Sequence, residues 1–356
     1  MTTATAAIRI RGHGADAALE YRRADVGSLL RNKHAEEALL LLPRLLPVCA
    51  QAQQIAAARA LEAARGKTES VQDQTQREAS LLREQALAAA WRLAVDWPRS
   101  MGEAPDLKYL KVLRRSSNSE LAMGLEALLP QVLRGDAAAL TDGEELISHL
   151  EASDPDTLAG RVIMQAKALA LPVAAALECL SGQALWERAS PTLSVPMAQS
   201  GAIDLSCAPQ PVTVGPLSMG RGPGIPALLA WEHSPVTLRL LLAALLDTVY
   251  LVQRLRVEVE PRGIDLSQRV LAPGMGVGHA ITSRGPLYHC IGIGEDRRIR
   301  HWRYLAPTDW HFAVGGLVDR LVKTCRSQHE LTLLVTAADP CARWDYRADG
   351  VDKDVA

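Results

Sequence analysis

The chain has few aromatic residues, and this shortage already favours one class of fold. Aromatic residues make up 4% of its 356 residues, and Phe312 is the only phenylalanine. The apolar residues, 48% of the chain, are mostly Ala, Leu and Val. Stretches rich in Ala and Leu favour helices over strands, and a chain of this length can bury a sizeable core. We therefore predict a mainly α fold with minor β structure (α+β).

The chain also lacks an excess of either charge, a secretory leader and an uninterrupted apolar run. The formal net charge of −1 argues against nucleic acid or an anionic membrane as a partner. Charged and apolar residues alternate over Ile8–Arg11, where a leader would be continuously apolar. The longest apolar stretch, Val236–Val252, contains Arg239 and Asp247, which favours a buried helix over a membrane span. We expect a cytoplasmic protein without nucleic-acid or membrane partners.

None of the six cysteines belongs to a CxxC pair, and the chain contains no phosphate-binding Walker loop. Reduced thiols are therefore expected. Composition alone favours the interpretation of Cys49 and Cys341 as small buried apolar side chains.

Periodicity and capping signals predict a single domain, residues 1–356, without internal repeats. Residues 261–278 read as a loop. The expected elements are a strand at Ile8–Arg11, a hairpin at Leu287–Tyr304, and helices at Leu29–Leu46, Ala50–Ala64, Glu78–Asp96, Leu121–Leu133, Thr157–Leu180, Val236–Arg256 and Phe312–Cys325.

Two segments far apart in the sequence each contain half of a known metal-binding motif. Arg44 and Cys49 stand at the spacing of R-x-C-x-x-C-x-x-x-H, but Leu46 occupies the first Cys position and Gln53 the His position. This segment resembles the N-terminal motif of the [NiFe]-hydrogenase large subunit. In that family four thiolates hold nickel and an iron that carries cyanide and carbon monoxide.

The C-terminal motif of the same family, D-P-C-x-x-C-x-x-H, is similarly incomplete here. Asp339, Pro340 and Cys341 match its beginning, whereas Trp344 stands at its second Cys and Arg347 at its His. Each end of the chain therefore keeps one thiol and lacks the other. The resemblance covers residues 8–60 and 270–347, and residues 348–356 are expected to form a flexible tail.

Between these motifs lies a third block, in which Arg284, Gly285 and His289 match the family pattern R-G-x-L-x-H. Downstream, Pro307 and Thr308 match its P-[ST] segment. The resemblance implies that the Arg and the Thr lie beside the cyanide ligands. A guanidinium and a hydroxyl suit terminal nitrogen acceptors in a dry pocket. The alternative interpretation of this block is a surface turn with a solvated Arg.

The departures from the family pattern argue against hydrogenase catalysis. Gly27 occupies the position of the proton-relay glutamate, and Leu46 and Trp344 cannot ligate a metal. Ser283 replaces the proline that precedes the family's arginine. Two thiolates, from Cys49 and Cys341, could still hold one iron.

This combination resembles the hydrogenase expression/formation proteins of the HupK or HoxV type. The resemblance implies a shortened large-subunit-like helical core and a non-enzymatic scaffold that transiently holds an Fe(CN)2(CO) group but no nickel. Cys49 and Cys341 would bind the iron. Arg284, Pro307, Thr308 and Asp339 would line the diatomic pocket, with Arg44, Gly285 and His289 in support. Expected partners are a HypC-type chaperone, HypD-type assembly machinery and the hydrogenase large subunit. The alternative is a metal-free structural or sensory paralogue of that subunit.

Overall fold

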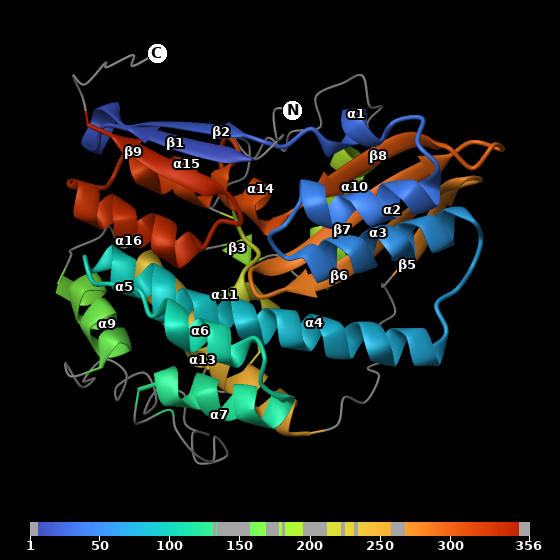
Figure 1. Cartoon of the computed structure of the whole chain (residues 1–356). Coiled ribbons are helices and arrows are strands. Elements are labelled where there is room, and N and C mark those ends of the chain that lie inside the picture. The colour runs from blue at the N-terminus through green and yellow to red at the C-terminus, as the bar shows by residue number, and fades with distance from the viewer. Residues whose placement is uncertain are drawn as a thin grey trace.

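The computed structural model of the chain describes residues 6–130, 133, 157–168, 178–179, 182–194, 212–221, 225–230, 234–257 and 268–348. Helices form most of the described structure, together with a four-stranded sheet, a three-stranded sheet and a short strand pair (Figure 1). The large-subunit-like mixture of helices and minor sheets agrees with the α+β prediction.

Helices occur along the whole described length of the chain. Their bounds are α1 Val26–Leu30, α2 Ala35–Leu45, α3 Ala50–Ala64, α4 Val71–Trp91, a π-helical turn Arg92–Asp96, α5 Trp97–Ser100, α6 Leu107–Leu113, α7 Asn118–Leu128, α9 Leu158–Ala168, α10 Gly182–Ser194, α11 Pro216–Met219, α12 Ile225–Ala230, α13 Val236–Arg256, α14 Pro307–Phe312, α15 Leu317–Val322 and α16 Gln328–Ala338, with a 3-10 turn at Gly14–Asp16.

The strands form three sheets. An antiparallel meander has the order β5 Gln268–Ala272, β6 Met275–Thr282, β7 Gly285–Ile293 and β8 Ile299–Leu305. A second sheet has β1 Ala7–Arg11 between antiparallel β2 Ala18–Arg22 and parallel β9 Arg343–Arg347. The parallel pair β3 Glu178–Cys179 and β4 Val212–Thr213 completes the set.

Several helix predictions need correction at their boundaries. The predicted helix Leu29–Leu46 is two helices, because residues 31–34 form a connection in which Asn32 has a φ of 62°. Pro43 lies inside α2 rather than at its end. The helix predicted to start at Glu78 begins at Val71, where Ser70 provides the N-cap.

The chain between residues 261 and 325 departs most from its prediction. Its described part, from residue 268, forms strands β5 and β6 where a loop was predicted. The predicted helix Phe312–Cys325 is instead the end of α14 and the separate helix α15, divided at Gly315–Gly316.

The predicted helix Thr157–Leu180 is helical over its described part, α9 Leu158–Ala168, but Cys179 belongs to strand β3. Residues 169–177 and 180 lie outside the described residues.

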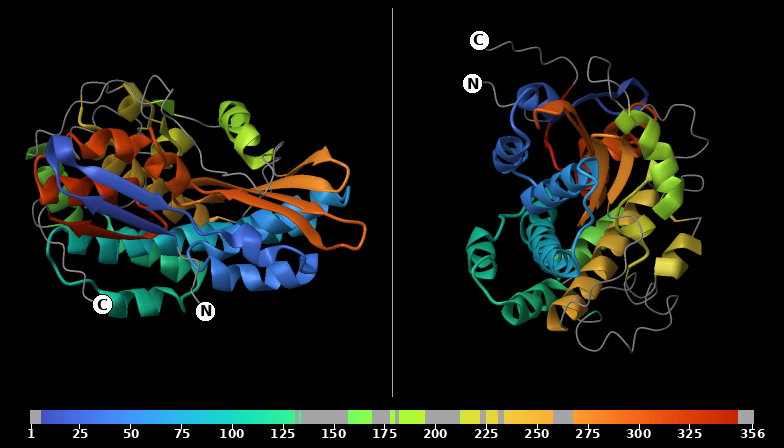
Figure 2. Two further views of the ribbon diagram at one scale, coloured as in Figure 1. Left: turned by 90° about the horizontal axis from the view of Figure 1, so that it is seen from above. Right: turned by 90° about the vertical axis from the view of Figure 1, so that its right-hand side faces the viewer.

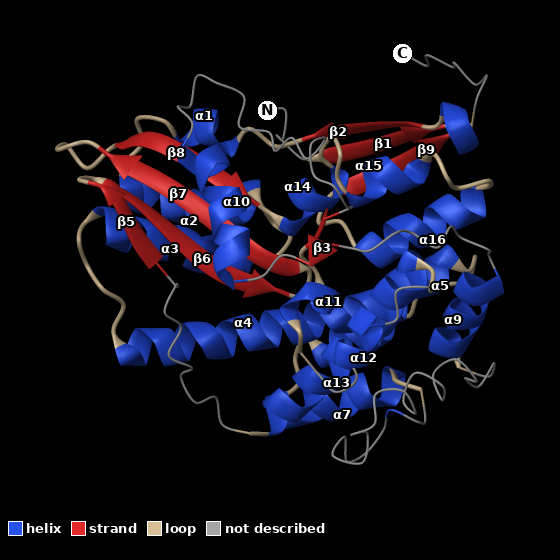
Figure 3. Cartoon of the chain, turned by 180° about the vertical axis from the view of Figure 1, so that it is seen from behind, coloured by secondary structure: helices blue, strands red, loops and turns tan. Residues whose placement is uncertain are grey.

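Helix α3 lies directly on the four-stranded sheet, chiefly over β6 and β7 (Figure 1). Gly276 and Gly278 make this close approach possible. A Cβ atom on Gly278 would stand 2.1 Å from the carbonyl oxygen of Ala56 and 2.3 Å from the amide nitrogen of Ala60. Helix α10 covers the other face of the sheet (Figure 3). The sheet therefore fixes the N-terminus of α3.

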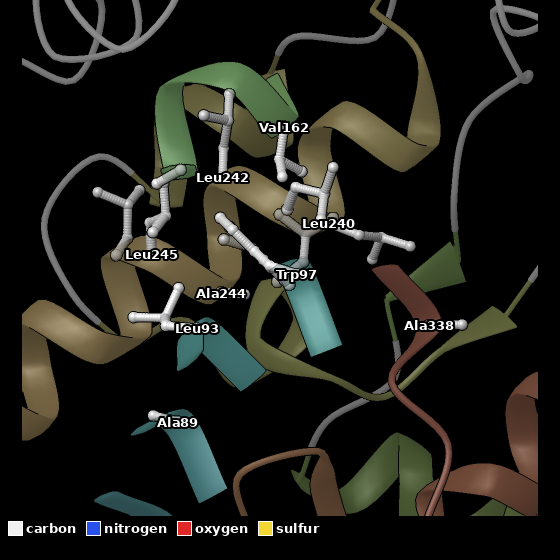
Figure 4. Packing of buried hydrophobic residues seen from close by; sticks show 14 of the residues in the cluster. Ala89, Leu93, Trp97, Val162, Leu240, Leu242, Ala244, Leu245 and Ala338 are labelled. Carbon is white, nitrogen blue, oxygen red and sulfur yellow. The ribbon is translucent and has the colours of Figure 1, made fainter. Parts of the chain in front are cut away.

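The main core surrounds α13, whose side chains are nearly all buried. Ala89 of α4, Leu93 of the π-helical turn, Trp97 of α5 and Val162 of α9 pack around the Leu240–Leu245 stretch of this helix (Figure 4). By length and composition α13 could cross a membrane, but 89% of its apolar window is buried inside the protein. Burial at this level is typical of a core helix, as the sequence predicts. The small sheet and the large sheet lie at opposite ends of the molecule, above the long helix α4 (Figures 1 and 2).

Candidate functional site

The motif residues meet where four chain segments come together. These segments are the start of α3, the turn between β6 and β7, the start of α14 and the end of α16. They carry Cys49, Arg284, Thr308 and the pair Asp339 and Cys341, respectively. Hydrogen bonds connect all of these segments, as described below.

Cys49 is the N-cap residue of α3 and adopts a left-handed backbone conformation with φ of 55°. Such a conformation is unusual for a residue with a Cβ atom. Burial raises the pKa of its thiol to about 12, while the nearby Arg284 guanidinium lowers it and the Cys341 thiol raises it. The Arg284 guanidinium also lowers the pKa of the Cys341 thiol, so the same cation acts on both thiols.

Arg284 occupies a two-residue turn between β6 and β7, yet its side chain is only 8% exposed. Its Nη2 lies 3.0 Å from Asp339 Oδ1, and its Nε donates to the Asp339 carbonyl oxygen at 2.9 Å. Its Nη1 donates to Cys49 Sγ at 3.5 Å. Burial opposes the guanidinium charge, but Asp339 and the two thiols outweigh it and raise the Arg284 pKa. The turn interpretation is correct, but the solvated-Arg interpretation is wrong.

Gly285 holds this turn in place against the neighbouring chain. Its φ is 127°, and a Cβ atom there would stand 2.0 Å from the carbonyl oxygen of Val214. The Thr282 hydroxyl donates to the Gly285 carbonyl oxygen at 2.8 Å and accepts from the Arg284 amide at 3.0 Å. The backbone before and after Arg284 is thereby fixed, which directs its side chain inward.

Cys341 is held from α14 rather than from α3. Its amide donates to Thr308 Oγ1 at 2.9 Å, and the same oxygen lies 2.8 Å from Cys341 Sγ. Pro307 is buried at the first position of α14, where its fixed φ suits the start of a helix. Burial raises the pKa of the Cys341 thiol, whereas Arg284 and the Thr308 hydroxyl lower it. Each thiol therefore has its own hydrogen-bonding partner, Arg284 for Cys49 and Thr308 for Cys341.

His289 is buried and forms hydrogen bonds through both of its ring nitrogens. Trp302 Nε1 donates to His289 Nδ1 at 3.1 Å, so the ring proton lies on Nε2, which is 2.7 Å from Gln53 Oε1. Burial lowers the pKa of His289 to about 3, and Arg23 contributes in the same direction. Gln53, at the motif's His position, lies one turn beyond Cys49 on α3.

Sequence reasoning missed two acidic groups and one basic group near the site. Arg92, in the π-helical turn, donates to Asp339 Oδ2 through Nη2 at 2.9 Å. Asp96 ends the same turn, and burial together with the Asp339 charge raises its pKa to about 6. Glu84 accepts from the amides of Gln51 and Ala52 at 2.8 and 2.9 Å, at the start of α3. A helical pattern gives no signal for any of the three.

The positions that lost their family ligands lie in different surroundings. Leu46 is partly buried and, like Cys49 and Cys341, packs against the hydrophobic cluster between α3 and the large sheet, whereas Trp344 packs against the main core. Trp344 belongs to β9, paired with Ile8 of β1. Arg44 is exposed, and no described hydrogen bond or ion pair involves its side chain, so the structure does not bring it into the site.

Within the part of the chain that the structure describes, no group of three or more His, Cys, Asp or Glu side chains could hold a metal ion. A metal at this site would have two thiolates as its protein ligands, and its other ligands would have to come from outside the protein. Two buried donor atoms at the site have no hydrogen-bond partner, Ser283 Oγ and Arg92 Nη1. Unsatisfied buried donors are costly, so a ligand rich in acceptors fits this donor set.

Comparison with known proteins shows relatives along almost the whole chain, although no protein-family profile matches it. The chain is 30% identical to the hydrogenase expression/formation protein HupK of Azotobacter vinelandii, with 93% of each chain covered. It is 29% identical to HupV of Azotobacter chroococcum, again with 93% covered. HoxV of Cupriavidus necator is 26% identical, with 88% of each chain covered.

Solved structures place the fold among [NiFe]-hydrogenase large subunits. The [NiFeSe] hydrogenase of Desulfovibrio vulgaris Hildenborough matches with a TM-score of 0.53 and 14% identity, covering 93% of this chain and 94% of that one. An NAD+-reducing [NiFe]-hydrogenase matches with a TM-score of 0.50 and 15% identity, covering 93% and 96%. At such identities the likeness concerns the fold alone. By its sequence, the chain belongs to the family of hydrogenase expression/formation proteins that includes HupK.

Proposed function

We propose that this chain is a non-catalytic scaffold in [NiFe]-hydrogenase maturation. Its cargo is an iron carrying two cyanides and one carbon monoxide, Fe(CN)2(CO), which it holds before transfer to the hydrogenase large subunit. Cys49 and Cys341 supply the two iron ligands. The cargo is a substrate that arrives and leaves, so the protein needs no resident metal.

The pairing of each thiol with its own hydrogen-bonding partner is the observation that carries this proposal. Arg284 Nη1 donates to Cys49 Sγ, and Thr308 Oγ1 lies at Cys341 Sγ. A guanidinium and a hydroxyl beside two thiolates can stabilise their charge and can also donate to cyanide nitrogens. A protein that uses this fold only as structure has no need for either pair.

The thiols must lose their protons before they can bind iron. Burial raises the pKa of both, so each favours its protonated form in the absence of cargo. Binding therefore releases protons, and affinity rises with pH. The raised pKa also favours release of the cargo, because a departing iron leaves behind thiolates that readily regain protons.

The incomplete motifs explain why the cargo would not mature in place. Nickel in the hydrogenase family requires thiolates at the positions of Leu46 and Trp344, and neither side chain can ligate a metal. Gly27, buried in α1, stands where the proton-relay carboxylate would be. Iron would thus bind without nickel, and hydrogen chemistry would not begin.

The same proposal assigns the partners. A HypC-type chaperone loaded by HypD-type machinery would deliver the iron group, and the hydrogenase large subunit would receive it. Delivery and acceptance of this group take place in the cytoplasm.

Infrared spectroscopy of the protein purified without oxygen tests the proposal, because bound cyanide and carbonyl absorb where protein does not. We expect these bands in the wild-type protein, with about one iron per chain as two thiolates to one metal require. Cys49→Ser and Cys341→Ser should each abolish the bands and impair hydrogenase maturation in cells.

Cys179→Ser is the matched control, because Cys179 is also a half-buried free cysteine but belongs to strand β3. It should retain iron and support maturation. Normal maturation by the Cys49→Ser, Cys341→Ser double variant would reject the scaffold and favour a metal-free structural or sensory paralogue.

A further inference from the structure

The small sheet presents a face rich in arginine to solvent. Nine residues share this face, because the register aligns alternate residues of β2, β1 and β9 in three rows. Five of the nine are arginines, and we call them the arginine face: Arg9, Arg11, Arg22, Arg343 and Arg347. The remaining four are Ala7, Ala18, Glu20 and Asp345.

The two carboxylates on this face leave most of its positive charge available. Asp345 lies 4.0 Å from Arg9 and 3.7 Å from Arg347, and these three side chains are between 43% and 49% exposed. Arg22 lies 3.3 Å from Glu20, with 69% and 48% exposed. Ion pairs at such exposure are weak and screened by salt. Five guanidiniums against two carboxylates therefore form a basic patch on a chain whose net charge is −1.

The opposite side of the same sheet packs on the main core, and one of its side chains reaches the candidate site. Tyr21 of β2 donates to Asp309 Oδ1 at 2.9 Å, and Asp309 follows Thr308 on α14. Strand β9 begins at Arg343, two residues after Cys341. Burial raises the Tyr21 pKa, and Asp309 and Cys341 are among the charges acting on it. The arginine face therefore begins at Arg343, on the strand that leads directly away from Cys341.

We propose that the arginine face is the docking surface for a partner protein with an acidic surface, one that exchanges the iron group at Cys341. This inference rests on the proposed function. Complementary charge on the two surfaces would speed the encounter and fix the orientation of the partner. Guanidiniums are suited to this task, because each can bind a carboxylate through two parallel hydrogen bonds.

The pattern of charge on the face favours a protein over nucleic acid or a membrane. Its middle row reads Glu20, Arg9 and Asp345, with the carboxylates on either side of the arginine. A phosphate backbone or an anionic bilayer carries charge of one sign and would be repelled by this row. A protein surface can place carboxylates against the outer rows and a basic or neutral group against the middle one.

Charge reversal tests the surface. The variant Arg11→Glu, Arg343→Glu, Arg347→Glu alters three exposed side chains, and Lys108→Glu, Lys111→Glu, Arg115→Glu makes the same change in net charge at exposed positions around α6. Figure 1 shows α6 on the opposite side of α4 from the small sheet. A third variant with Gln at 11, 343 and 347 guards against misfolding caused by reversal.

Binding is measured by titration with the purified HypC-type chaperone and, separately, with the unprocessed hydrogenase large subunit. We expect the arginine-face reversal to weaken binding of at least one by about tenfold or more, and the Gln variant to weaken it less. The α6 control should bind like wild type. The difference should shrink as salt is raised from about 0.05 to 0.5 M.

Equal binding by the reversed and wild-type proteins would overturn the proposal, as would tighter binding of duplex DNA or anionic vesicles than of either protein. Iron content separates this failure from failure of the proposed function. If only the docking surface is wrong, protein from cells carries the cyanide and carbonyl bands with the arginine face reversed. If the scaffold itself is wrong, wild-type protein lacks them.

Discussion

Arg92 and Asp339, 247 residues apart, form a buried ion pair in which Nη2 lies 2.9 Å from Oδ2. The other oxygen of the same carboxylate lies 3.0 Å from Arg284 Nη2. One carboxylate therefore forms ion pairs with two guanidiniums. Burial alone would raise the pKa of Asp339, but Arg284 and Arg92 together hold it below its ordinary value.

This shared carboxylate predicts non-additive stability. Arg284→Leu leaves Asp339 paired with Arg92, and Arg92→Leu leaves it paired with Arg284, so each single variant should remain folded. The double variant leaves a buried carboxylate without a partner, which is strongly destabilising. We expect it to lose about 0.5–3 kcal/mol more than the sum of the two single losses. Urea unfolding curves measure all three.

A triple variant that adds Asp339→Asn is the control for this cycle. It removes the unpaired charge, so most of the extra loss should disappear. Additive losses in the double variant would show that Asp339 does not couple the two arginines. The Arg284→Leu variant alone should lose the iron group while its unfolding midpoint stays close to that of Arg92→Leu.

Local sequence signals predicted the elements whose ends are marked by residues of strong preference. Helix α3 matches its prediction at both ends, because an Ala-rich run favours a helix and Pro47 and Gly66 mark its two boundaries. Helix α13 also matches, following Pro235. Strands β5 and β6 were missed because the glycines of residues 261–278 indicate a loop. Gly276 and Gly278 serve instead to let α3 approach the sheet, a demand that only the tertiary structure reveals.

The site, too, contains residues that the sequence could predict and residues that it could not. Arg284, Thr308 and Asp339 could be selected from motif spacing, and the structure brings them to the two thiols. Arg92 and Glu84 could not be selected, because their roles depend on partners supplied by folding. Arg44 matches the motif but is exposed, so spacing alone overstated its part.

Asp96 should make the stability of the protein depend on pH. Burial, followed by the neighbouring Asp339, raises its pKa from 3.8 to about 6. Its protonated form is thus favoured in the folded state, and the stability it contributes is complete below about pH 4 and is lost as the pH rises through about 6. Asp96→Asn keeps an acceptor for Trp91 Nε1 but does not ionise.

We therefore expect Asp96→Asn and wild type to melt at similar temperatures near the low end of this range. The variant should become relatively more stable at neutral pH. Calorimetric or fluorescence melts of the two proteins across the range measure the difference. A constant difference between the melting temperatures would contradict the role assigned to Asp96.

Gly278→Ala should destabilise the fold and disturb the site together. The added Cβ would stand 2.1 Å from the Ala56 carbonyl oxygen, which is backbone and cannot move aside alone. Overpacking of this kind typically costs about 1–3 kcal/mol. Helix α3 would have to shift, so the Cys49 thiol at its start should react faster with a thiol reagent than in wild type.

Gly215→Ala is the matched control for that comparison. A Cβ atom at Gly215 would meet only ordinary contacts, 3.6 Å from the Arg284 carbonyl oxygen and 3.8 Å from His311 Cε1. It should keep the urea midpoint and the thiol reactivity of wild type. Equal effects of the two substitutions would show that contact between α3 and β6 is not the cause.

Restoring cysteine at both lost positions should not create a nickel site. Trp344 lies on β9 and packs against the main core, whereas Leu46, like Cys49 and Cys341, packs against the cluster between α3 and the large sheet. The new thiols of Leu46→Cys, Trp344→Cys would therefore lie in different surroundings, and nickel needs several soft ligands on one centre. We expect elemental analysis after anaerobic incubation with nickel to find no more metal than in wild type. Stoichiometric nickel in the double variant would contradict this, because it would require β9 to leave its pairing with β1 in order to bind the metal.

The wild-type protein and the double variant should also keep their C-terminal tail. Intact-mass spectrometry should find both proteins uncleaved through Ala356 in nickel-replete cells. Trimming of the wild-type tail would reject the nickel-free scaffold.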